Sequence, residues 1–103
     1  MLNFLKKIFG SAPKQDLTQM IKEGAYLVDV RSAMEFRAGS VKGSVNIPLD
    51  TIPSQIQKFK GKKNIIVFCR SGNRSSQAKM YLEQQGFNNV VNGGTWQNVK
   101  AFV

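Results

Sequence analysis

Asn64-Ile-Ile-Val-Phe-Cys69 is the clearest β-strand pattern in the sequence, and it leads directly into Arg70-Ser-Gly-Asn-Arg74. Four consecutive large apolar residues are typical of a parallel strand that is covered on both faces. From Arg74 to Gln85 the apolar spacing predicts a helix, with Gly86 as its left-handed cap. This strand, loop and helix predict a central strand that ends at the cysteine.

Strand and helix patterns also alternate in the rest of the chain. Before the central strand we expect a helix between Asp16 and Gly24, a strand over Tyr26–Val30, and a helix through Phe36 that starts with a capping box of Ser32 and Glu35. A short extended piece over Val45–Pro48 and a helix over Thr51–Lys60 should follow. After it we expect a last strand at Val90-Val91, a tight turn at Gly93-Gly94 and a helix over Trp96–Val103 with Trp96, Val99 and Val103 on one face. This alternation predicts an α/β fold with a mostly parallel central sheet and helices on both faces.

The length of 103 residues fits one compact domain. We expect residues 1–15 to form a short amphipathic segment and a connector, and residues 16–103 to form the folded domain. The amphipathic segment allows two interpretations, a short helix packed on the domain or a weak membrane-surface anchor. No apolar run approaches the roughly 18 to 20 residues that span a bilayer, and no secretory signal pattern is present. We therefore expect a cytoplasmic protein with no membrane span.

The chain is strongly basic, with 15 Lys and Arg against 6 Asp and Glu and a net charge of +9. Such a surface favours anionic partners, although it also simply keeps a protein soluble. The chain lacks the interleaved basic and aromatic residues of RNA-binding modules, so we expect no nucleic-acid partner. The charge alone does not choose between the remaining anionic partners, such as acidic lipid or a small oxyanion.

The sequence contains one cysteine and no histidine. A single Cys forms no internal disulfide, and without His it builds no ordinary zinc site, so we expect no metal and no cofactor. The lack of His also removes the commonest general base. A nucleophile in this chain must therefore be activated by electrostatics and hydrogen bonds.

The loop after Cys69 has the composition of an anion cradle at the edge where α/β sheets bind ligands. Gly72 allows positive φ, so that the backbone N–H groups of Arg70, Ser71, Gly72, Asn73 and Arg74 converge at a helix N-terminus. This setting, with the charges of Arg70 and Arg74, can lower a thiol pKa from about 8.5 to between about 3.5 and 7.5. The alternative is a packed structural cysteine. The loop composition favours a reactive thiol at the surface of a cleft.

Several motifs spread over the chain resemble the rhodanese family of sulfurtransferases, specifically its single-domain members. The resemblance runs from about Asp16 to Trp96 and is carried by Leu27-Val-Asp-Val-Arg31, Glu35-Phe36, Gly39, Gly43-Ser-Val-Asn-Ile-Pro48, Ile65-Ile-Val-Phe-Cys-Arg-Ser-Gly-Asn-Arg74, Gly86-Phe87 and Gly93-Gly94. It implies a rhodanese-like fold. The sequence departs from the family pattern at two positions. The family often has His where Ser40 stands, and Trp96 lies one residue closer to the glycine pair than the family's closing Trp.

The resemblance implies that Cys69 takes a sulfane sulfur from thiosulfate or a similar donor as a persulfide and passes it to cyanide or a thiol. The loop Arg70–Arg74 would hold the persulfide. Asp29 and Arg31 would give structural support beside the site. The expected partners are a small anionic sulfur donor and a thiol or cyanide acceptor, and a protein persulfide donor or acceptor is also possible.

Two other functions fit parts of the pattern. One is a persulfide carrier or partner-binding module without turnover, which the basic surface would suit. The other is a Cys-based phosphatase, whose motif places five residues between Cys and Arg, whereas four lie between Cys69 and Arg74. The shorter loop makes a smaller ring, which is matched to a persulfide sulfur. The sequence thus favours the sulfurtransferase over both alternatives.

Overall fold

The computed structural model describes residues 16–103, and they form an α/β fold around one four-stranded parallel sheet. The strands are β1 (Tyr26–Asp29), β2 (Val45–Asn46), β3 (Ile65–Cys69) and β4 (Val90–Thr95), in the spatial order β2-β1-β3-β4. This confirms the predicted fold class. The expected amphipathic segment and connector over residues 1–15 lie outside the described residues.

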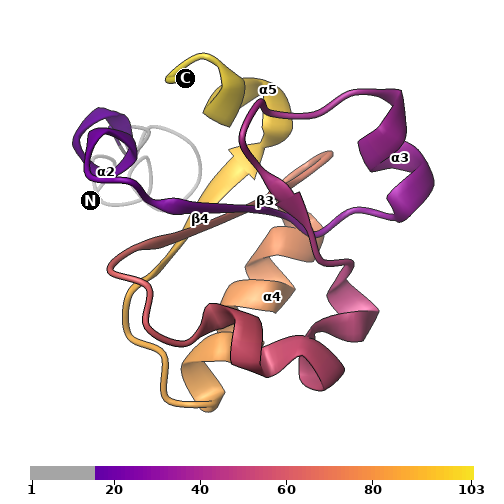
Figure 1. Ribbon diagram of the computed structural model, residues 1–103. Helices are drawn as coiled ribbons and strands as arrows, with labels where there is room; N and C mark the ends of the chain where they lie inside the picture. Colours follow the sequence, from indigo (N-terminus) through magenta and orange to yellow (C-terminus); the bar gives the residue numbers. More distant parts are fainter. Residues whose placement is uncertain (1–15) are drawn as a thin grey trace, which may run out of the picture.

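Helices cover both faces of the sheet. They are α2 (Thr18–Lys22), α3 (Ala33–Ala38), the 3₁₀ segment η1 (Leu49–Phe59), α4 (Asn73–Gln84) and α5 (Trp96–Lys100). In Figure 1, η1 and α4 lie below the sheet as drawn, and α2 and α5 lie above it. Within residues 16–103, no helix is both long enough and apolar enough to cross a membrane.

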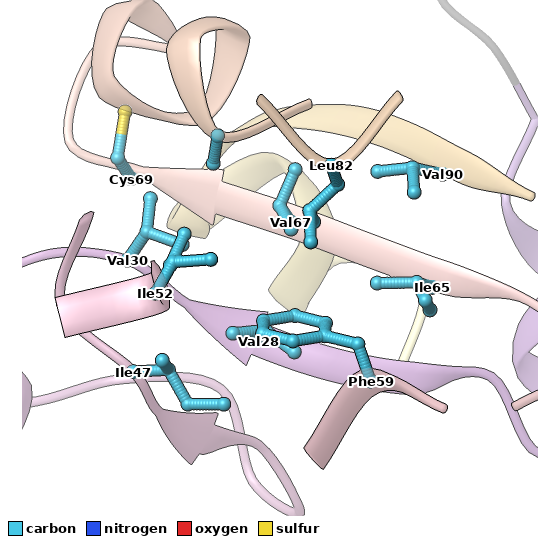
Figure 2. Packing of buried hydrophobic residues seen from close by; sticks show 11 residues of the cluster. Val28, Val30, Ile47, Ile52, Phe59, Ile65, Val67, Cys69, Leu82 and Val90 are labelled. Atoms are coloured by element: carbon cyan, nitrogen blue, oxygen red, sulfur yellow. The ribbon is translucent and has the colours of Figure 1, made fainter. Parts of the chain in front are cut away.

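β3 is an internal strand, and all five of its residues are buried. Successive side chains of a strand point to opposite faces. Ile65, Val67 and Cys69 therefore pack on the face of α4 and η1, while Ile66 and Phe68 pack on the face of α2 and α5. Figure 2 shows Cys69 at the end of this strand beside Val30, with its sulfur pointing away from the other apolar side chains. The alternation thus places the thiol on the face of α4.

The capping signals read from the sequence correspond to real helix ends. Ser32 and Glu35 form the predicted capping box at the start of α3, which runs two residues past the predicted end at Phe36. Gly86 has φ +97° after α4, and the N–H of Phe87 donates to the carbonyl of Leu82 at 3.1 Å. Such signals succeed because they depend on neighbours within one turn.

The helix expected over Thr51–Lys60 is instead a 3₁₀ segment over Leu49–Phe59 with a kink at Gln55. Pro53 lacks the N–H that an α-helix needs. The hydroxyls of Thr51 and Ser54 also donate to backbone carbonyls three residues earlier, which competes with regular α-helix bonding. The segment still buries Ile52 and Phe59 beneath the sheet.

The predicted terminal helix over Trp96–Val103 ends earlier, at Lys100. Trp96 and Val99 pack inward as expected, but Val103 is 57% exposed and Phe102 packs on the core in its place. The predicted inward position of Val103 is therefore wrong. The helical spacing does not continue to that residue, because the helix has already ended.

The tight turn predicted at Gly93-Gly94 is also wrong, because both glycines lie inside β4. The pairing of β3 with β4 shifts register there: Val67 faces Asn92, and Phe68 faces Gly94. Gly94 has φ +82° in this bulge. A Cβ at Gly93 would lie 2.6 Å from Val99 Cγ2 and 2.9 Å from Ile66 Cγ2. The two glycines thus serve a bulge and a close approach, not a chain reversal.

We expect Gly93→Ala to destabilise the domain by about 1 to 3 kcal/mol, since Val99 and Ile66 are fully buried and cannot move aside freely. Gly94→Ala is the matched control: its Cβ meets no atom within 4 Å, so only the left-handed backbone is strained, at about 1 kcal/mol. Urea unfolding of the two variants measures the difference. A Gly93→Ala variant as stable as the wild-type protein would contradict the close approach.

Candidate functional site

The candidate site is centred on Cys69 at the carboxyl end of β3, where the loop Arg70–Gly72 leads into α4. Gly72 adopts φ +94°, as the sequence predicts. Its N–H donates to the Cys69 Sγ at 3.0 Å. A residue with a side chain is strained in this conformation, so Gly72 is the residue that turns the loop back over the sulfur.

The first turn of α4 completes the contacts of the sulfur. The N–H of Ser75 donates to Sγ at 3.4 Å, and the Ser75 Oγ also lies 3.4 Å from Sγ. Ser75 is fully buried. Ser75 is not among the site residues predicted from the sequence, although a serine at the third position of a helix that begins beside a cysteine is a usable signal.

Two opposing influences act on the pKa of Cys69. Burial of the thiol raises the pKa, because it disfavours the charged thiolate. Hydrogen bonds to the sulfur from the Ser75 hydroxyl and from the N–H groups of Ser75, Ser71 and Gly72 lower the pKa by more. The net result is a pKa below the ordinary value, so the cradle favours the thiolate that a sulfur nucleophile needs.

We expect Ser75→Ala to raise the pKa of Cys69, because the largest stabilising contact of the thiolate is lost. The fraction of thiolate then falls at every pH below the new pKa, and thiol alkylation becomes slower there. The rate of iodoacetamide alkylation as a function of pH measures the shift. Ser76→Ala, at an exposed position one residue further along α4, is the matched control. Identical profiles for the two variants would contradict the role of Ser75.

Arg74 is held by an ion pair with Glu35 of α3, across 39 residues of sequence. Its Nη1 and Nη2 donate to Glu35 Oε1 and Oε2 at 2.7 and 3.0 Å. The Arg74 guanidinium, together with the Ser32 N–H, lowers the pKa of Glu35 to about 2. The pair raises the pKa of Arg74, to which the nearby Cys69 also contributes. Arg74 therefore lies beside the site with Nη1 and Nη2 bound to a carboxylate.

The other predicted residues around the loop are more exposed to solvent. Arg70, Ser71 and Asn73 are exposed. The N–H of Asn73 donates to the Ser71 Oγ at 3.4 Å. The predicted contacts of Arg70 and Asn73 with a ligand remain predictions. Ser71 contributes to the cradle through its backbone N–H.

Asp29 and Arg31 form a buried ion pair at the end of β1. Arg31 Nη2 lies 2.7 Å from Asp29 Oδ2, and its Nε donates to both carboxylate oxygens at 3.0 Å. Ser40, where the resembled family often has His, donates its hydroxyl to Asp29 Oδ2 at 2.6 Å. Arg31 also donates to the carbonyl of Gly39 and lies over the ring of Trp96. The pair ties β1 to the segment after α3.

Two hollows flank the loop. One, of about 270 Å³, is lined by Ser71, Gly94 and Thr95 among others. The other, of about 490 Å³, is lined by Arg74, Val30, Pro48 and Leu49 among others. Cys69 lines neither hollow, and its exposure is 0%. The expectation of a thiol at the surface of a cleft is therefore wrong for this conformation. The loop turns over the sulfur, with the Gly72 N–H 3.0 Å from Sγ, so the thiol is covered.

The family model for the rhodanese-like domain matches residues 13–98. A sulfurtransferase of Allochromatium vinosum is 36% identical, and the match covers 68% of this chain but only 65% of that protein. The thiosulfate sulfurtransferase GlpE of Pseudomonas savastanoi is 36% identical over 84% of this chain and 83% of its own. A solved rhodanese with anions from E. coli superimposes with a TM-score of 0.66 and 31% identity, over 73% of this chain and 91% of its own.

Proposed function

Because this chain belongs to the rhodanese family, we propose that it is a sulfurtransferase with Cys69 as the residue that carries sulfur. The observation that carries the proposal is the set of N–H groups directed at Cys69 Sγ from Gly72 and Ser75, at the carboxyl end of a buried parallel strand. Those donors favour a thiolate, and they also suit the anionic outer sulfur of a persulfide.

The proposed cycle has two balanced steps. The Cys69 thiolate attacks the outer sulfur of thiosulfate; a new S–S bond forms, the old one breaks, and sulfite leaves with its electron pair. Cyanide or an organic thiolate then attacks the outer sulfur of the persulfide, and thiocyanate or a new persulfide leaves. The Cys69 thiolate is regenerated. Neither step needs a histidine base, and the chain has none.

The residues around Cys69 have distinct roles in this proposal. The loop Arg70–Arg74 holds the persulfide through its N–H groups, as anionic groups are held at helix N-termini. The exposed Arg70 places a positive charge at the loop, which attracts the anionic donor, whereas the charge of Arg74 is largely compensated by Glu35. Asp29 and Arg31 give structural support beside the site, at the end of β1. The net charge of +9 strengthens the attraction for the donor.

Intact-mass analysis after incubation with thiosulfate tests the proposal. We expect the mass of one added sulfur atom, which cyanide removes as thiocyanate. Because Cys69 is the only cysteine, the added sulfur has one expected location. No gain with thiosulfate, but a gain with a cysteine desulfurase, would contradict the small-donor cycle and indicate a carrier loaded by a protein. Phosphate release from an aryl phosphate without any thiocyanate would contradict sulfur transfer itself.

A further inference from the structure

Asn92 of β4 joins three segments through one side-chain amide. Its Oδ1 accepts the hydroxyl of Ser75 at 2.7 Å and the N–H of Gly94 at 2.9 Å. Its Nδ2 donates to the carbonyl of Gly72 at 3.2 Å. Asn92 faces Val67 at the edge of the bulge between β3 and β4. The amide thus links the bulge of β4 with the loop after Cys69 and with the first turn of α4.

Both residues that Asn92 holds from outside its own strand also contact the Cys69 sulfur. Gly72 donates its N–H to Sγ, and Ser75 contacts Sγ through its N–H and its Oγ. We propose that Asn92 is a positioning residue for sulfur transfer: it holds the Gly72 backbone and the Ser75 hydroxyl against Cys69, and it competes with the sulfur for the hydroxyl proton. This inference rests on the proposed function of Cys69.

The competition arises because the Ser75 hydroxyl has one proton and two neighbouring acceptors. Because an amide oxygen can only accept, the 2.7 Å contact places the Ser75 hydroxyl as the donor to Asn92 Oδ1. The 3.4 Å contact with Sγ then suits a protonated thiol that donates to Ser75 Oγ. When Cys69 is ionised, the hydroxyl turns to the thiolate. Asn92 Oδ1 keeps the N–H of Gly94 as a partner, so no buried acceptor is left unsatisfied.

A negative charge at position 92 should therefore change the pKa of the Cys69 thiol. In Asn92→Asp the carboxylate binds the Ser75 hydroxyl more strongly, repels a thiolate and places an oxygen opposite the Gly72 carbonyl. The first two changes raise the pKa of Cys69 directly, and the third does so by weakening the hold on Gly72, whose N–H donates to the sulfur. We expect a shift of at least about one pH unit in the alkylation profile, which is roughly a tenfold slower reaction below the pKa. The variants leave unchanged the charged groups around the site: Asp29, Arg31, Glu35, Asp50, Arg70 and Arg74.

The experiment measures iodoacetamide alkylation against pH for Asn92→Asp in the wild-type and Ser75→Ala backgrounds. We expect a clearly smaller shift in the Ser75→Ala background, where only through-space repulsion and the loop contact remain. The matched control is Asn89→Asp, which makes the same charge change before the start of β4, where the Asn89 amide binds the carbonyls of Lys62 and Lys63. It should leave the profile unchanged.

Equal shifts in the two backgrounds, an unshifted Asn92→Asp profile, or an equal shift from Asn89→Asp would each overturn the inference. Circular dichroism on every variant confirms that the folded protein is compared. Alkylation requires no sulfur donor, so its outcome is independent of turnover. A coupled shift without any sulfur transfer would retain the role of Asn92 and reject the proposed function. Active sulfur transfer with equal shifts in the two backgrounds would support the proposed function and reject the role of Asn92.

Discussion

Replacing Cys69 with serine is expected to abolish sulfur transfer, lowering the rate by at least about 10³-fold. A serine oxygen cannot form a persulfide, and its hydroxyl stays protonated at neutral pH. The measurement is thiocyanate formation from thiosulfate and cyanide, together with intact mass. Because Cys69 is the only cysteine, the variant offers no second thiol to replace it.

The fold of Cys69→Ser should persist. Serine has nearly the shape of cysteine, and its oxygen can accept the N–H groups of Gly72 and Ser75 that now point at the sulfur. We expect a melting temperature within several degrees of the wild-type value. A variant that still forms thiocyanate would contradict the assignment of Cys69. A variant that fails to fold would show that the thiol is needed for packing, so Cys69→Ala would then repeat the activity test.

Asp29→Asn is expected to destabilise the domain by about 3 kcal/mol or more. Asp29 has 0% exposure and Arg31 has 5%, so the substitution leaves a buried guanidinium without its counter-charge. An asparagine oxygen still accepts some of the hydrogen bonds, but the charge that compensates Arg31 is gone. Arg31 Cζ lies 5.1 Å from the ring centre of Trp96, the only tryptophan in the sequence. Urea unfolding followed by tryptophan fluorescence therefore measures the loss of stability.

Glu83→Gln is the matched control for Asp29→Asn. It breaks the Lys79–Glu83 pair of α4, which joins the same types of charge four residues apart on an exposed surface. Water already solvates such a pair, so we expect a loss of no more than about 0.5 kcal/mol. Equal losses in the two variants would show that burial of the Asp29–Arg31 pair contributes nothing. A double variant that replaces both Asp29 and Arg31 with apolar residues should recover part of the loss.

The burial of Cys69 has a consequence for the proposed cycle. The thiol has the hydrogen bonds that favour ionisation, yet 0% of its residue surface is exposed. The residues that follow it, Arg70 and Ser71, are themselves exposed and belong to the short loop before α4. Loops of this kind open at small free-energy cost. In the proposed cycle we therefore expect the donor to gain access by moving the loop, and not by entering a preformed cleft.

Much of the fold follows from contacts between residues close in sequence, and these the sequence predicted. The apolar run before Cys69 identified a buried inner strand, and the pairing of Ser32 with Glu35 identified the start of α3. Gly72 and Gly86 marked the two positive-φ positions around α4. Each of these features depends on side chains within a few residues, so its signal is written in one short stretch of the sequence.

Features that depend on distant residues were decided only by the tertiary structure. The ion pair of Arg74 has no local signal in the sequence, because α3 brings Glu35 to it from 39 residues away. Gly93-Gly94 reads locally as a turn, and only the neighbouring Val99 and Ile66 show why two glycines stand inside a strand. Asn92 reaches Ser75 across 17 residues through the β3–β4 pairing. A sequence pattern records how each segment folds, but packing alone determines which side chains meet between segments.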